Sequence, residues 1–229
     1  MTSLVDINNL KKTYVMGSNV VKALDGIDMN IKHGEYISIV GPSGSGKSTL
    51  MNMIGCLDAP DFGSYMLDGV DVSNMNDNEL AKIRSEKIGF VFQGFNLLPK
   101  LTAIENVELP LIYRGYNHKK RKAMALEALE RVGLGDRTHH RPSELSGGQM
   151  QRVAVARALA GNPPIILADE PTGNLDTQTG KEILETLEKI HQQGNTIILI
   201  THDESLANQA KRRIVIRDGL IMRDEEGRQ

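Results

Sequence analysis

Cysteine is almost absent from the sequence: Cys56 is the only one, which excludes an internal disulfide framework. We expect Cys56 to be a small buried apolar side chain in a reducing compartment. The sequence also lacks an apolar run near the roughly 18 residues that a membrane-spanning helix needs. Its first residues lack the basic and apolar regions of a signal peptide. These absences predict a chain that stays inside the cell and reaches a membrane only through a partner.

An excess of charge of one sign is absent as well. The sequence has 27 basic and 29 acidic residues, which gives a formal net charge of −2 at pH 7. Proteins that bind nucleic acid usually carry a basic surface, so the composition argues against DNA or RNA as a main ligand. A length of 229 residues can bury one sizeable core and fits a single large domain, or a core with a modest insertion.

Short apolar runs alternate with helical patterns along the chain. Apolar strands between helices indicate an α/β fold with a mostly parallel sheet that helices cover on both faces. Asp218-Gly219 predicts a two-residue hairpin turn, and the tail Asp224–Gln229 is expected to be frayed. Strands are predicted at Ile27–Ile31, Tyr36–Val40, Ile88–Phe92, Ile165–Asp169, Thr196–Thr201 and Arg213–Arg217, and helices at Lys47–Leu57, Thr102–Tyr113, Lys119–Val132, Gly147–Ala160 and Thr177–Gln193.

One long stretch, about 76–161, begins with a single strand pattern and continues with successive helical patterns. Gly133 suits the end of one of these helices, and Asn162-Pro163-Pro164 ends another before the next strand. We therefore predict a helical subdomain of about 76–161 that is inserted into a core of about 1–75 and 162–229.

A phosphate-binding loop is the first strong motif. Its glycines let successive N–H groups point at phosphate oxygens, and the N-terminus of the following helix adds positive potential. Lys47 is expected at the β and γ phosphates, Ser48 at Mg²⁺ and Thr49 at the α phosphate. The alternative is a glycine-rich turn that binds nothing, but an apolar strand before the motif and a helix after it favour the phosphate loop. The motif matches G-x-x-x-x-G-K-[ST] with Gly41, Pro42, Ser43, Gly44, Ser45, Gly46, Lys47 and Ser48.

Two carboxylates, Asp169 and Glu170, end the apolar strand that begins at Ile165. Ligands of open α/β sheets bind at the carboxyl ends of the strands, where both side chains are expected. Asp169 is predicted to hold Mg²⁺ through water, and Glu170 is predicted to accept a proton from the attacking water. Paired acids at a strand end are otherwise only a solvated terminus, an alternative that the phosphate loop in the same chain disfavours.

The run Leu145-Ser146-Gly147-Gly148-Gln149 lies between these two motifs and is the most informative feature of the sequence. With it, the chain resembles the ATP-binding cassette (ABC) ATPases from about residue 4 to residue 223. The resemblance implies a single ABC ATPase domain over residues 1–229 that binds and hydrolyses ATP with Mg²⁺. It also implies a P-loop NTPase (RecA-like) core with a mostly parallel sheet, an N-terminal antiparallel β part and an inserted α-helical subdomain.

Further site residues follow from this resemblance. Tyr14 matches the aromatic residue whose ring stacks on adenine, although a tyrosine near a strand end often serves only in packing. Gln93 matches the glutamine that reaches Mg²⁺ and the attacking water, and His202 matches the histidine that contacts the γ phosphate. Asp176 matches a loop that suits contact with a second copy of the chain. The catalytic residues expected on this basis are Lys47, Gln93, Glu170 and His202, and the expected magnesium ligands are Ser48, Gln93 and Asp169.

The signature run itself is predicted to bind an anion. Ser146 precedes a helix, and Gly147 and Gly148 let the first N–H groups of that helix approach a phosphate closely. In the family this phosphate belongs to ATP on the opposite subunit, so two chains are expected to sandwich two ATP molecules head to tail. Gln149 and Asp176 are expected at the same ATP. The alternative for the signature is a capped helix with flexible glycines.

Local runs also resemble one branch of the family, the MacB and LolD type, whose members partner FtsX-like permeases. These runs are Phe92–Pro99, Glu105–Leu111 and Leu111–Gly115. They predict a subunit at the inner face of the cell membrane that powers a permease, with a bias toward export of lipoprotein, peptide or macrolide-type substrates. Gly94 stands where many members have a second glutamine, and Asn174 where small residues are common.

The segment from Gly94 to Leu101 is predicted to contact the permease. It carries an apolar cluster on a loop, and surface apolar patches commonly mark partner contacts. The alternative is packing between the core and the helical subdomain. The cluster consists of Phe95, Leu97, Leu98 and Pro99.

Other classes of function are less consistent with the sequence. Chromosome-type ABC proteins carry long coiled coils between the phosphate loop and the signature, whereas this chain has a compact insertion there. Ribosome-type members usually have two cassettes in one chain, and this chain has one. A binding module without hydrolysis is expected to lack the base or the histidine, yet Gln93, Glu170 and His202 are all present.

Overall fold

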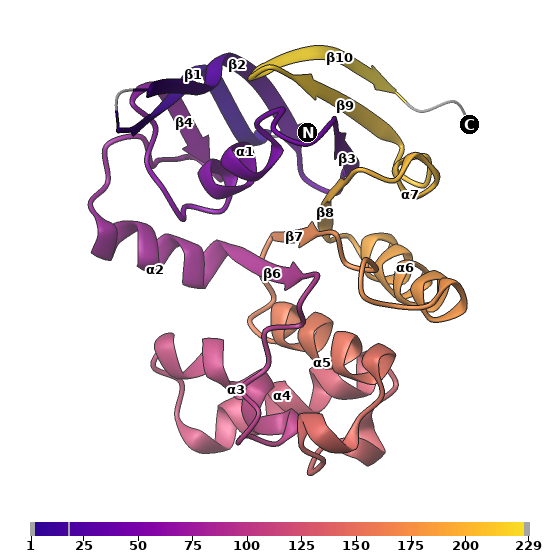
Figure 1. The fold of residues 1–229 in the computed structure, drawn as a ribbon. Coiled ribbons are helices and arrows are strands. Elements are labelled where there is room, and N and C mark those ends of the chain that lie inside the picture. Colours follow the sequence, from indigo (N-terminus) through magenta and orange to yellow (C-terminus); the bar gives the residue numbers. More distant parts are fainter. Residues whose placement is uncertain (1–2, 18, 227–229) are drawn as a thin grey trace. The chain divides into compact units, whose positions relative to one another are not determined.

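The computed structural model describes residues 3–17 and 19–226, and its chain forms two compact units (Figure 1). Unit 1 consists of residues 1–84 and 196–229, and unit 2 consists of residues 85–195. The boundaries of the helical subdomain, about 76–161, remain a prediction from the sequence. The first two residues, on which the signal-peptide prediction partly depends, lie outside the described residues. Within the described part of the chain, no helix combines the length and apolar character needed to cross a membrane.

An antiparallel sheet of four strands forms one part of unit 1, as far as the described residues extend. The predicted strand Ile27–Ile31 lies at the end of its second strand, which is longer than expected. Register shifts between Ile7 and Leu10, with φ of 48° at Asn9, mark a β-bulge in its first strand. The strands are β1 (Ser3–Met16), β2 (Asn19–Lys32), β4 (Phe62–Leu67) and β5 (Val70–Asp71), in the spatial order β2-β1-β4-β5.

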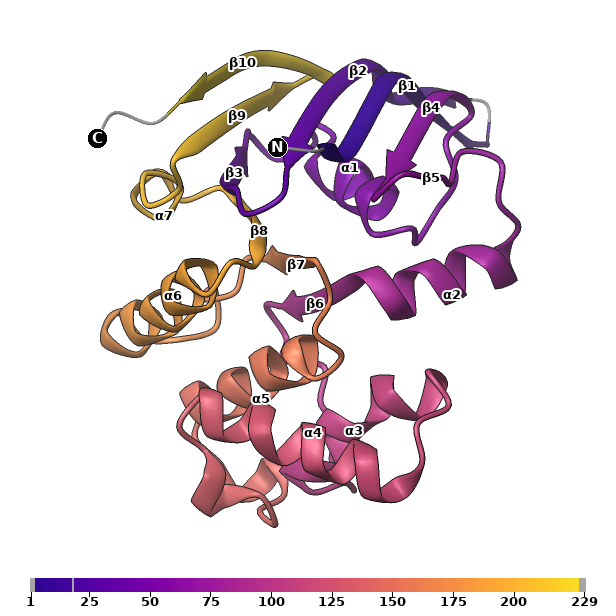
Figure 2. The ribbon, with the colours of Figure 1, turned by 180° about the vertical axis from the view of Figure 1, so that it is seen from behind.

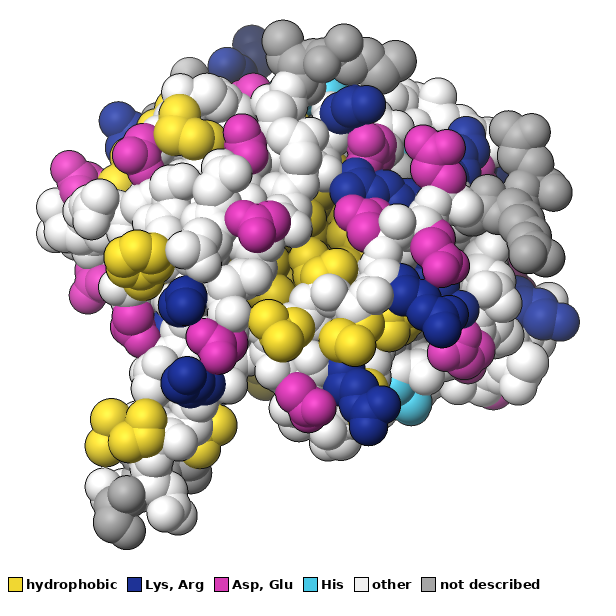
Figure 3. Space-filling model, turned by 90° about the horizontal axis from the view of Figure 1, so that it is seen from above, with side chains coloured by type: hydrophobic (Ala, Val, Ile, Leu, Met, Phe, Trp, Pro, Cys, Tyr) yellow, Lys and Arg dark blue, Asp and Glu magenta, His cyan; other side chains and the backbone are white. Residues whose placement is uncertain are grey.

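The hairpin of β1 and β2 projects from unit 1, and hydrophobic side chains gather near its end (Figure 3). The valines Val15 and Val20 are 73% and 65% exposed there. On the rest of the face in Figure 3, basic and acidic side chains are interspersed. This face therefore has mixed charge rather than a field of one sign.

The other strands of unit 1 lie in the order β10-β9-β3-β8. The strand β3 pairs in parallel with β8 and β9, whereas β10 is antiparallel to β9 and lies beside β2 (Figures 1 and 2). Asp218 and Gly219 form the predicted turn with φ of 51° and 76°. The bounds are β3 (Tyr36–Val40), β8 (Thr196–Thr201), β9 (Arg212–Arg217) and β10 (Leu220–Glu226), with helices α1 (Lys47–Ile54) and α7 (Glu204–Ala207).

The frayed tail predicted at Asp224–Gln229 is wrong where the structure describes it. Asp224 belongs to β10, and both of its carboxylate oxygens accept hydrogen bonds from Arg212 at 2.7 Å. This ion pair between paired strands holds the last strand in place. Residues 227–229 lie outside the described residues.

Unit 2 contains two parallel strands and a group of helices. Figure 2 shows α3, α4 and α5 together, and these helices contact one another. Thr102 and Glu105 form a capping box at the start of α3, which is why the predicted helix begins there. The strands are β6 (Ile88–Phe92) and β7 (Ile165–Asp169); the helices are α3 (Ala103–Tyr113), α4 (His118–Arg131), α5 (Gly147–Leu159) and α6 (Thr177–Gln192), with short 3₁₀ turns at Gly135–Arg137 and Pro142–Glu144. The helix α2 (Asp77–Lys87) leads from unit 1 into unit 2 along the chain.

Cys56 is buried as predicted, with 1% of its surface exposed. Burial raises the pKa of the thiol to about 12, although the charge of nearby Arg84 acts in the opposite direction. Because the thiolate is the reactive form, we expect iodoacetamide at pH 8 to modify Cys56 about a thousandfold more slowly in the folded protein than in urea. Mass spectrometry of timed samples measures both rates. Equal rates in the two conditions would contradict this prediction.

Candidate functional site

The phosphate loop of unit 1 connects β3 to α1. All five residues of β3 are buried, so the apolar run fixes where the loop begins. Gly46 has φ of 105°, and a Cβ at this position would lie 2.6 Å from the carbonyl oxygen of Ala23, so only glycine fits. The N–H of Ser45 donates to the carbonyl of Pro42 at 3.2 Å, and the N–H of Gly219 donates to the carbonyl of Ser45 at 3.0 Å. The turn after β9 thereby braces the loop.

Among the described residues, the N-terminus of α1 at Gly46 lacks the side-chain cap that α3, α4, α5, α6 and α7 have. Lys47 Nζ donates to the carbonyls of Gly41 at 2.7 Å and Pro42 at 2.9 Å, so the ammonium group lies over the loop. Ser45 Oγ is buried and has no hydrogen-bond partner within the described part of the chain. First-turn N–H groups, an ammonium and a hydroxyl form the donor set that suits a polyphosphate, so these residues fit the predicted ligand.

Tyr14 lies in β1 and is half-buried. Its hydroxyl donates to Asp58 Oδ2 at 3.0 Å, and Lys12 Nζ lies 5.4 Å from the centre of its ring. Lys12 also donates to Asp58 Oδ1 at 2.8 Å. Burial, and then the hydrogen bond to Asp58, raises the pKa of Tyr14, so its phenol stays protonated. Asp58, which Lys12 also pairs with, therefore holds the polar end of the ring.

His202 follows β8 and is exposed. Because β3 and β8 pair in parallel with Val40 opposite Thr201, Gly41 and His202 leave the same edge of the sheet. Asp203, the next residue, caps α7 by accepting from the N–H groups of Ser205 and Leu206. The structure thus brings the histidine to the edge that carries the phosphate loop.

The carboxyl ends of β6 and β7 form the corresponding edge in unit 2. These strands pair in parallel with Phe92 opposite Asp169, so Gln93 and Glu170 both follow directly from paired residues. Asp169 and Glu170 are half-buried. Glu170 has φ of 43°, in the left-handed region that is uncommon for residues other than glycine, and its carbonyl accepts from the N–H of Gly173 at 3.1 Å. This tight turn orients the glutamate at the strand end.

The signature forms the start of α5. Ser146 is the N-cap residue and accepts from the N–H of Gln149, while the Gln149 side chain accepts from the N–H of Ser146 at 2.9 Å. This capping box uses the Ser146 hydroxyl but leaves the N–H groups of Gly147 and Gly148 in the first turn. The geometry is therefore compatible with both sequence interpretations, an anion site and a capped helix.

Asp176 caps the next helix, α6. Its carboxylate accepts from the N–H groups of Gln178 and Thr179 and from the Thr179 hydroxyl at 2.6 Å. These bonds, chiefly the one from the Thr179 hydroxyl, lower the pKa of Asp176. An exposed carboxylate at a helix N-terminus therefore stays ionised and holds the loop that precedes α6.

Each unit thus carries one part of the predicted site. Unit 1 contains Tyr14, the phosphate loop with Thr49, and His202, and unit 2 contains Gln93, Asp169, Glu170, the signature and Asp176. Within unit 2, a Cβ built on Gly147 would lie 3.3 Å from Leu175 and 3.9 Å from Phe95. The signature therefore lies beside the residues that follow Gln93 and those that precede Asp176. The described residues include no group of three or more His, Cys, Asp or Glu side chains that could hold a metal ion.

The residues that hold these side chains, Asp58 and Asn174, lie outside the sequence motifs. Asp58 anchors Tyr14, and no motif marks it. Asn174 donates from Nδ2 to the carbonyl of Gln93 at 3.0 Å and accepts from Gln93 Nε2 at 3.3 Å. The only sequence signal for Asn174 was that it is larger than the small residues common at this position in the resembled family.

Comparisons with known proteins agree with the motifs. The sequence profile of the family described as ABC transporter matches residues 24–173. An ABC transporter ATP-binding protein of Thermotoga maritima is 54% identical over 221 residues, which cover 96% of this chain and 94% of that protein. The macrolide export ATP-binding/permease protein MacB of Bdellovibrio bacteriovorus is 52% identical over 222 residues, which cover 97% of this chain and 34% of MacB.

A solved structure matches the fold as well as the sequence. It is a dimeric, post-hydrolysis state of the ATP-binding cassette MJ0796, a protein of Methanocaldococcus jannaschii, bound to ADP and Pi. The TM-score is 0.88 at 50% identity, and the match covers 98% of this chain and 99% of the solved chain.

Proposed function

This chain belongs to the ABC transporter family as an ATP-binding and ATP-hydrolysing subunit similar to the cassette of MacB, and from that premise we propose how its residues act and with which partners. The observation that carries the proposal is at the N-terminus of α1. Among the described residues no side chain caps it, and the ammonium group of Lys47 lies over the loop before it. Phosphates of ATP bind there through the N–H groups of the loop from Gly41 to Ser48. The ring of Tyr14 stacks on adenine, and Thr49 binds the α phosphate.

The side-chain oxygens of Ser48 and Gln93 would hold Mg²⁺, and Asp169 would hold it through water. This set of one hydroxyl, one amide and one carboxylate would suit Mg²⁺, which usually retains water and binds substrate phosphates. When bound, Mg²⁺ neutralises part of the phosphate charge.

Hydrolysis breaks the bond between the β and γ phosphates. Glu170 accepts the proton of the water that attacks the γ phosphorus, and Gln93 orients this water. Lys47 and His202 stabilise charge on the γ phosphate as ADP leaves. Lys47 is suited to this task because its ammonium already lies on the phosphate loop.

A second copy of the chain completes each site. The N–H groups of Gly147 and Gly148, with Ser146 and Gln149, bind the γ phosphate of ATP on the opposite subunit. Asp176 stabilises the loop that contacts that subunit. The dimeric state of the similar cassette MJ0796 supports this arrangement.

The partner in the membrane is an FtsX-like permease. MacB of Bdellovibrio bacteriovorus is an ATP-binding/permease protein, and this chain matches 34% of its length, which supports a permease as the partner of the present chain. The subunit then lies at the cytoplasmic face of the membrane and powers export of a lipoprotein, peptide or macrolide-type substrate. Substrate specificity belongs to the permease.

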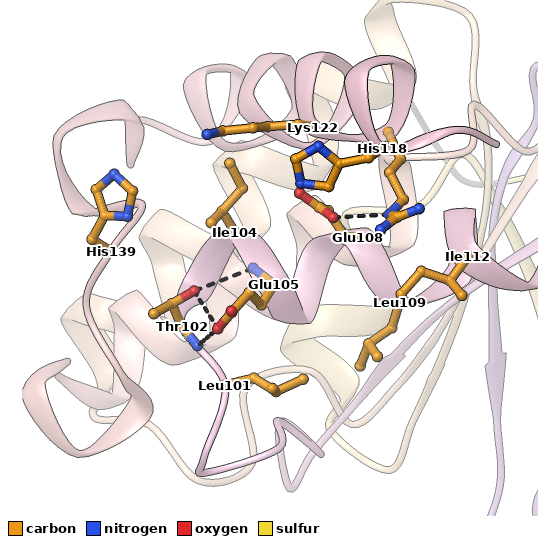
Figure 4. A pocket seen from close by; sticks show the side chains of 11 residues that line it. Leu101, Thr102, Ile104, Glu105, Glu108, Leu109, Ile112, His118, Lys122 and His139 are labelled. Carbon is orange, nitrogen blue, oxygen red and sulfur yellow. Dashed lines mark hydrogen bonds and ion pairs between the residues drawn. The ribbon is translucent and has the colours of Figure 1, made fainter.

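The permease contacts unit 2 beside the segment 94–101. Phe95 of this segment is half-buried and lies near Gly147, which favours packing for its ring, but Leu98 is 49% exposed. Next to the segment is a cavity of about 440 Å³ that α3 and α4 line, with Leu101 and the 48% exposed Ile112 among its residues (Figure 4). Charged and polar side chains of both signs also line it, namely Glu105, Glu108, His118, Arg121, Lys122 and His139. An apolar cytoplasmic helix of the permease fits the exposed apolar side chains of this lining.

We expect the double variant Leu98→Asp, Ile112→Asp to lose permease binding by about tenfold or more, because two exposed apolar contacts become charged. The measurement is co-purification with the membrane permease, together with transport. ATP binding should persist, since neither side chain belongs to the phosphate site.

The matched control is Leu126→Asp, because Leu126 is 38% exposed on α4 of the same unit. The control should leave permease binding unchanged. Normal transport by the double variant would eliminate the docking surface. Loss of ATP binding in the double variant would instead assign Leu98 and Ile112 to packing within unit 2.

A further inference from the structure

The loop that follows β6, residues 93–96, has an unusual backbone; we refer to it as the Gln93 loop. Phe95 and Asn96 are consecutive residues with φ of 60° and 51°. Left-handed conformations are unfavourable for residues other than glycine and persist where neighbouring groups hold them. The groups that hold the Gln93 loop are therefore part of what places Gln93.

Arg157 is the main group that holds this loop. It lies near the C-terminal end of α5, and its Nη2 donates to the carbonyl of Phe95 at 2.9 Å while Nη1 donates to the carbonyl of Asn96. Burial lowers the pKa of Arg157, but a guanidinium remains charged in proteins. Moving a half-buried charge away from its hydrogen-bond acceptors is costly, so the fork fixes the end of the loop on α5.

Two further contacts tie the start of the loop. Gln151 of α5 donates from Nε2 to the carbonyl of Phe92 at 3.3 Å. Asn174 exchanges two hydrogen bonds with Gln93, one of them to the backbone carbonyl. The strand β6 also packs directly on α5, because a Cβ on Gly89 would clash with the carbonyl oxygen of Ala158. The loop and the strand end before it are thus bonded to α5 at Phe92, Phe95 and Asn96, and Gln93 is bonded to Asn174.

The same helix carries the signature at its other end. Gln151 Nε2 donates not only to Phe92 but also to the carbonyl of Pro171, the residue after Glu170. We propose that Arg157 and Asn174 are positioning residues that fix the Gln93 loop rigidly to the signature helix α5. Gln93 then reaches its catalytic position when the signature binds the ATP of a second copy. This inference rests on the proposed trans role of the signature.

The first test is a double-mutant cycle on ATP turnover. Arg157→Lys keeps the charge but loses the two-pronged donation, and we expect kcat to fall about tenfold with little change in the Kd for ATP. In a Gln93→Ala background the same substitution should change kcat less than twofold, because the side chain that Arg157 positions is gone. If Arg157→Lys lowers kcat by the same factor in the wild-type and Gln93→Ala backgrounds, the proposal is overturned.

The second readout is amide hydrogen exchange of the nucleotide-free chain. Arg157→Lys should raise exchange in residues 92–96 and leave α3 and α4 unchanged. Arg114→Lys is the matched control, because Arg114 also donates to backbone carbonyls of unit 2, those of Ser85, Glu86 and Gly161. The control should not raise exchange at 92–96, and its effect on kcat should be the same in both backgrounds. Uniform loosening of unit 2 by Arg157→Lys would contradict the positioning role.

Asn174→Ala decides the question if Arg157→Lys does not fold, because Asn174 is exposed and its loss threatens the fold less. It should lower kcat in the wild-type background but not in Gln93→Ala, and a decrease in both would refute the proposal. Ser146→Arg tests the underlying trans role separately. Full ATPase activity of Ser146→Arg would contradict the proposed function. If Ser146→Arg is inactive but Arg157→Lys lowers kcat by the same factor with and without Gln93→Ala, only the present inference is contradicted.

Discussion

Replacing Glu170 with glutamine is expected to lower ATP turnover by about 10² or more while ATP binding persists. The amide has the shape of the carboxylate but cannot accept the proton of the attacking water. Glu170 follows β7 in a tight turn that its own carbonyl closes with Gly173, so the substitution leaves the turn's hydrogen bond in place. Because hydrolysis separates the ATP sandwich, the variant should accumulate as an ATP-bound dimer on size-exclusion chromatography.

Glu185→Gln is the control for this prediction, since Glu185 is an exposed carboxylate on α6 of the same unit. It should retain normal turnover and show no ATP-dependent dimer. Near-normal turnover in purified Glu170→Gln would refute the assignment of the base. Loss of nucleotide binding in this variant would instead give Glu170 a role in holding ATP.

Mixing two inactive chains is expected to restore activity. Lys47→Ala removes the ammonium group of the phosphate loop, and Ser146→Arg blocks the signature. A dimer of one chain of each kind has one site with both defects and one site with neither. With random pairing at equal concentrations, about a quarter of the wild-type number of intact sites should form. ATPase assays of the two chains, separately and mixed, measure this recovery.

The control for the mixing experiment is a chain that carries both substitutions, mixed with Lys47→Ala. No pairing of these two chains contains an intact site, so activity should stay at background. If the signature served the ATP of its own chain, every chain in the original mixture would carry a defect in its own ATP site, and mixing would restore no activity. An original mixture without recovery would therefore exclude the trans arrangement.

The sequence predicted the central strands well, because strands buried on both faces appear as continuous apolar runs. The predicted bounds of β3, β6, β7 and β8 coincide with the observed ones. The strand β1 was missed because its bulge places the buried residues Ile7 and Leu10 three apart, which breaks the alternation of a half-buried strand. The helix α2 was not predicted because Leu80 is its one buried residue, which leaves no helical periodicity of apolar side chains to detect. The predicted helix from Lys47 ends at Ile54 rather than Leu57, because Cys56 has φ of 51°.

The site divides in a similar way. The residues that we propose to touch phosphate, metal or water lie in or beside short motifs, so they could be identified from those motifs and from the family resemblance that the motifs carry. Residues that hold them could not, because Asp58 reaches Tyr14, and Arg157 reaches Phe95, through single hydrogen bonds between distant parts of the sequence. Such a bond requires one suitable side chain at one place and creates no pattern along the chain. Their detection depends on the fold.

The bracing of the phosphate loop by Gly219 has a consequence for the order in which a growing chain can fold. The central strand β3 pairs with β8 and β9, and the hydroxyl of Ser38 donates to the carbonyl of Ala207, 169 residues later. Unit 2 is continuous in sequence, whereas unit 1 joins two distant segments. Synthesis from the N-terminus therefore completes unit 2 first, and the nascent phosphate loop obtains its sheet only after β9 has left the ribosome. Until then, nucleotide in the cell cannot protect the emerging chain against misfolding or proteases.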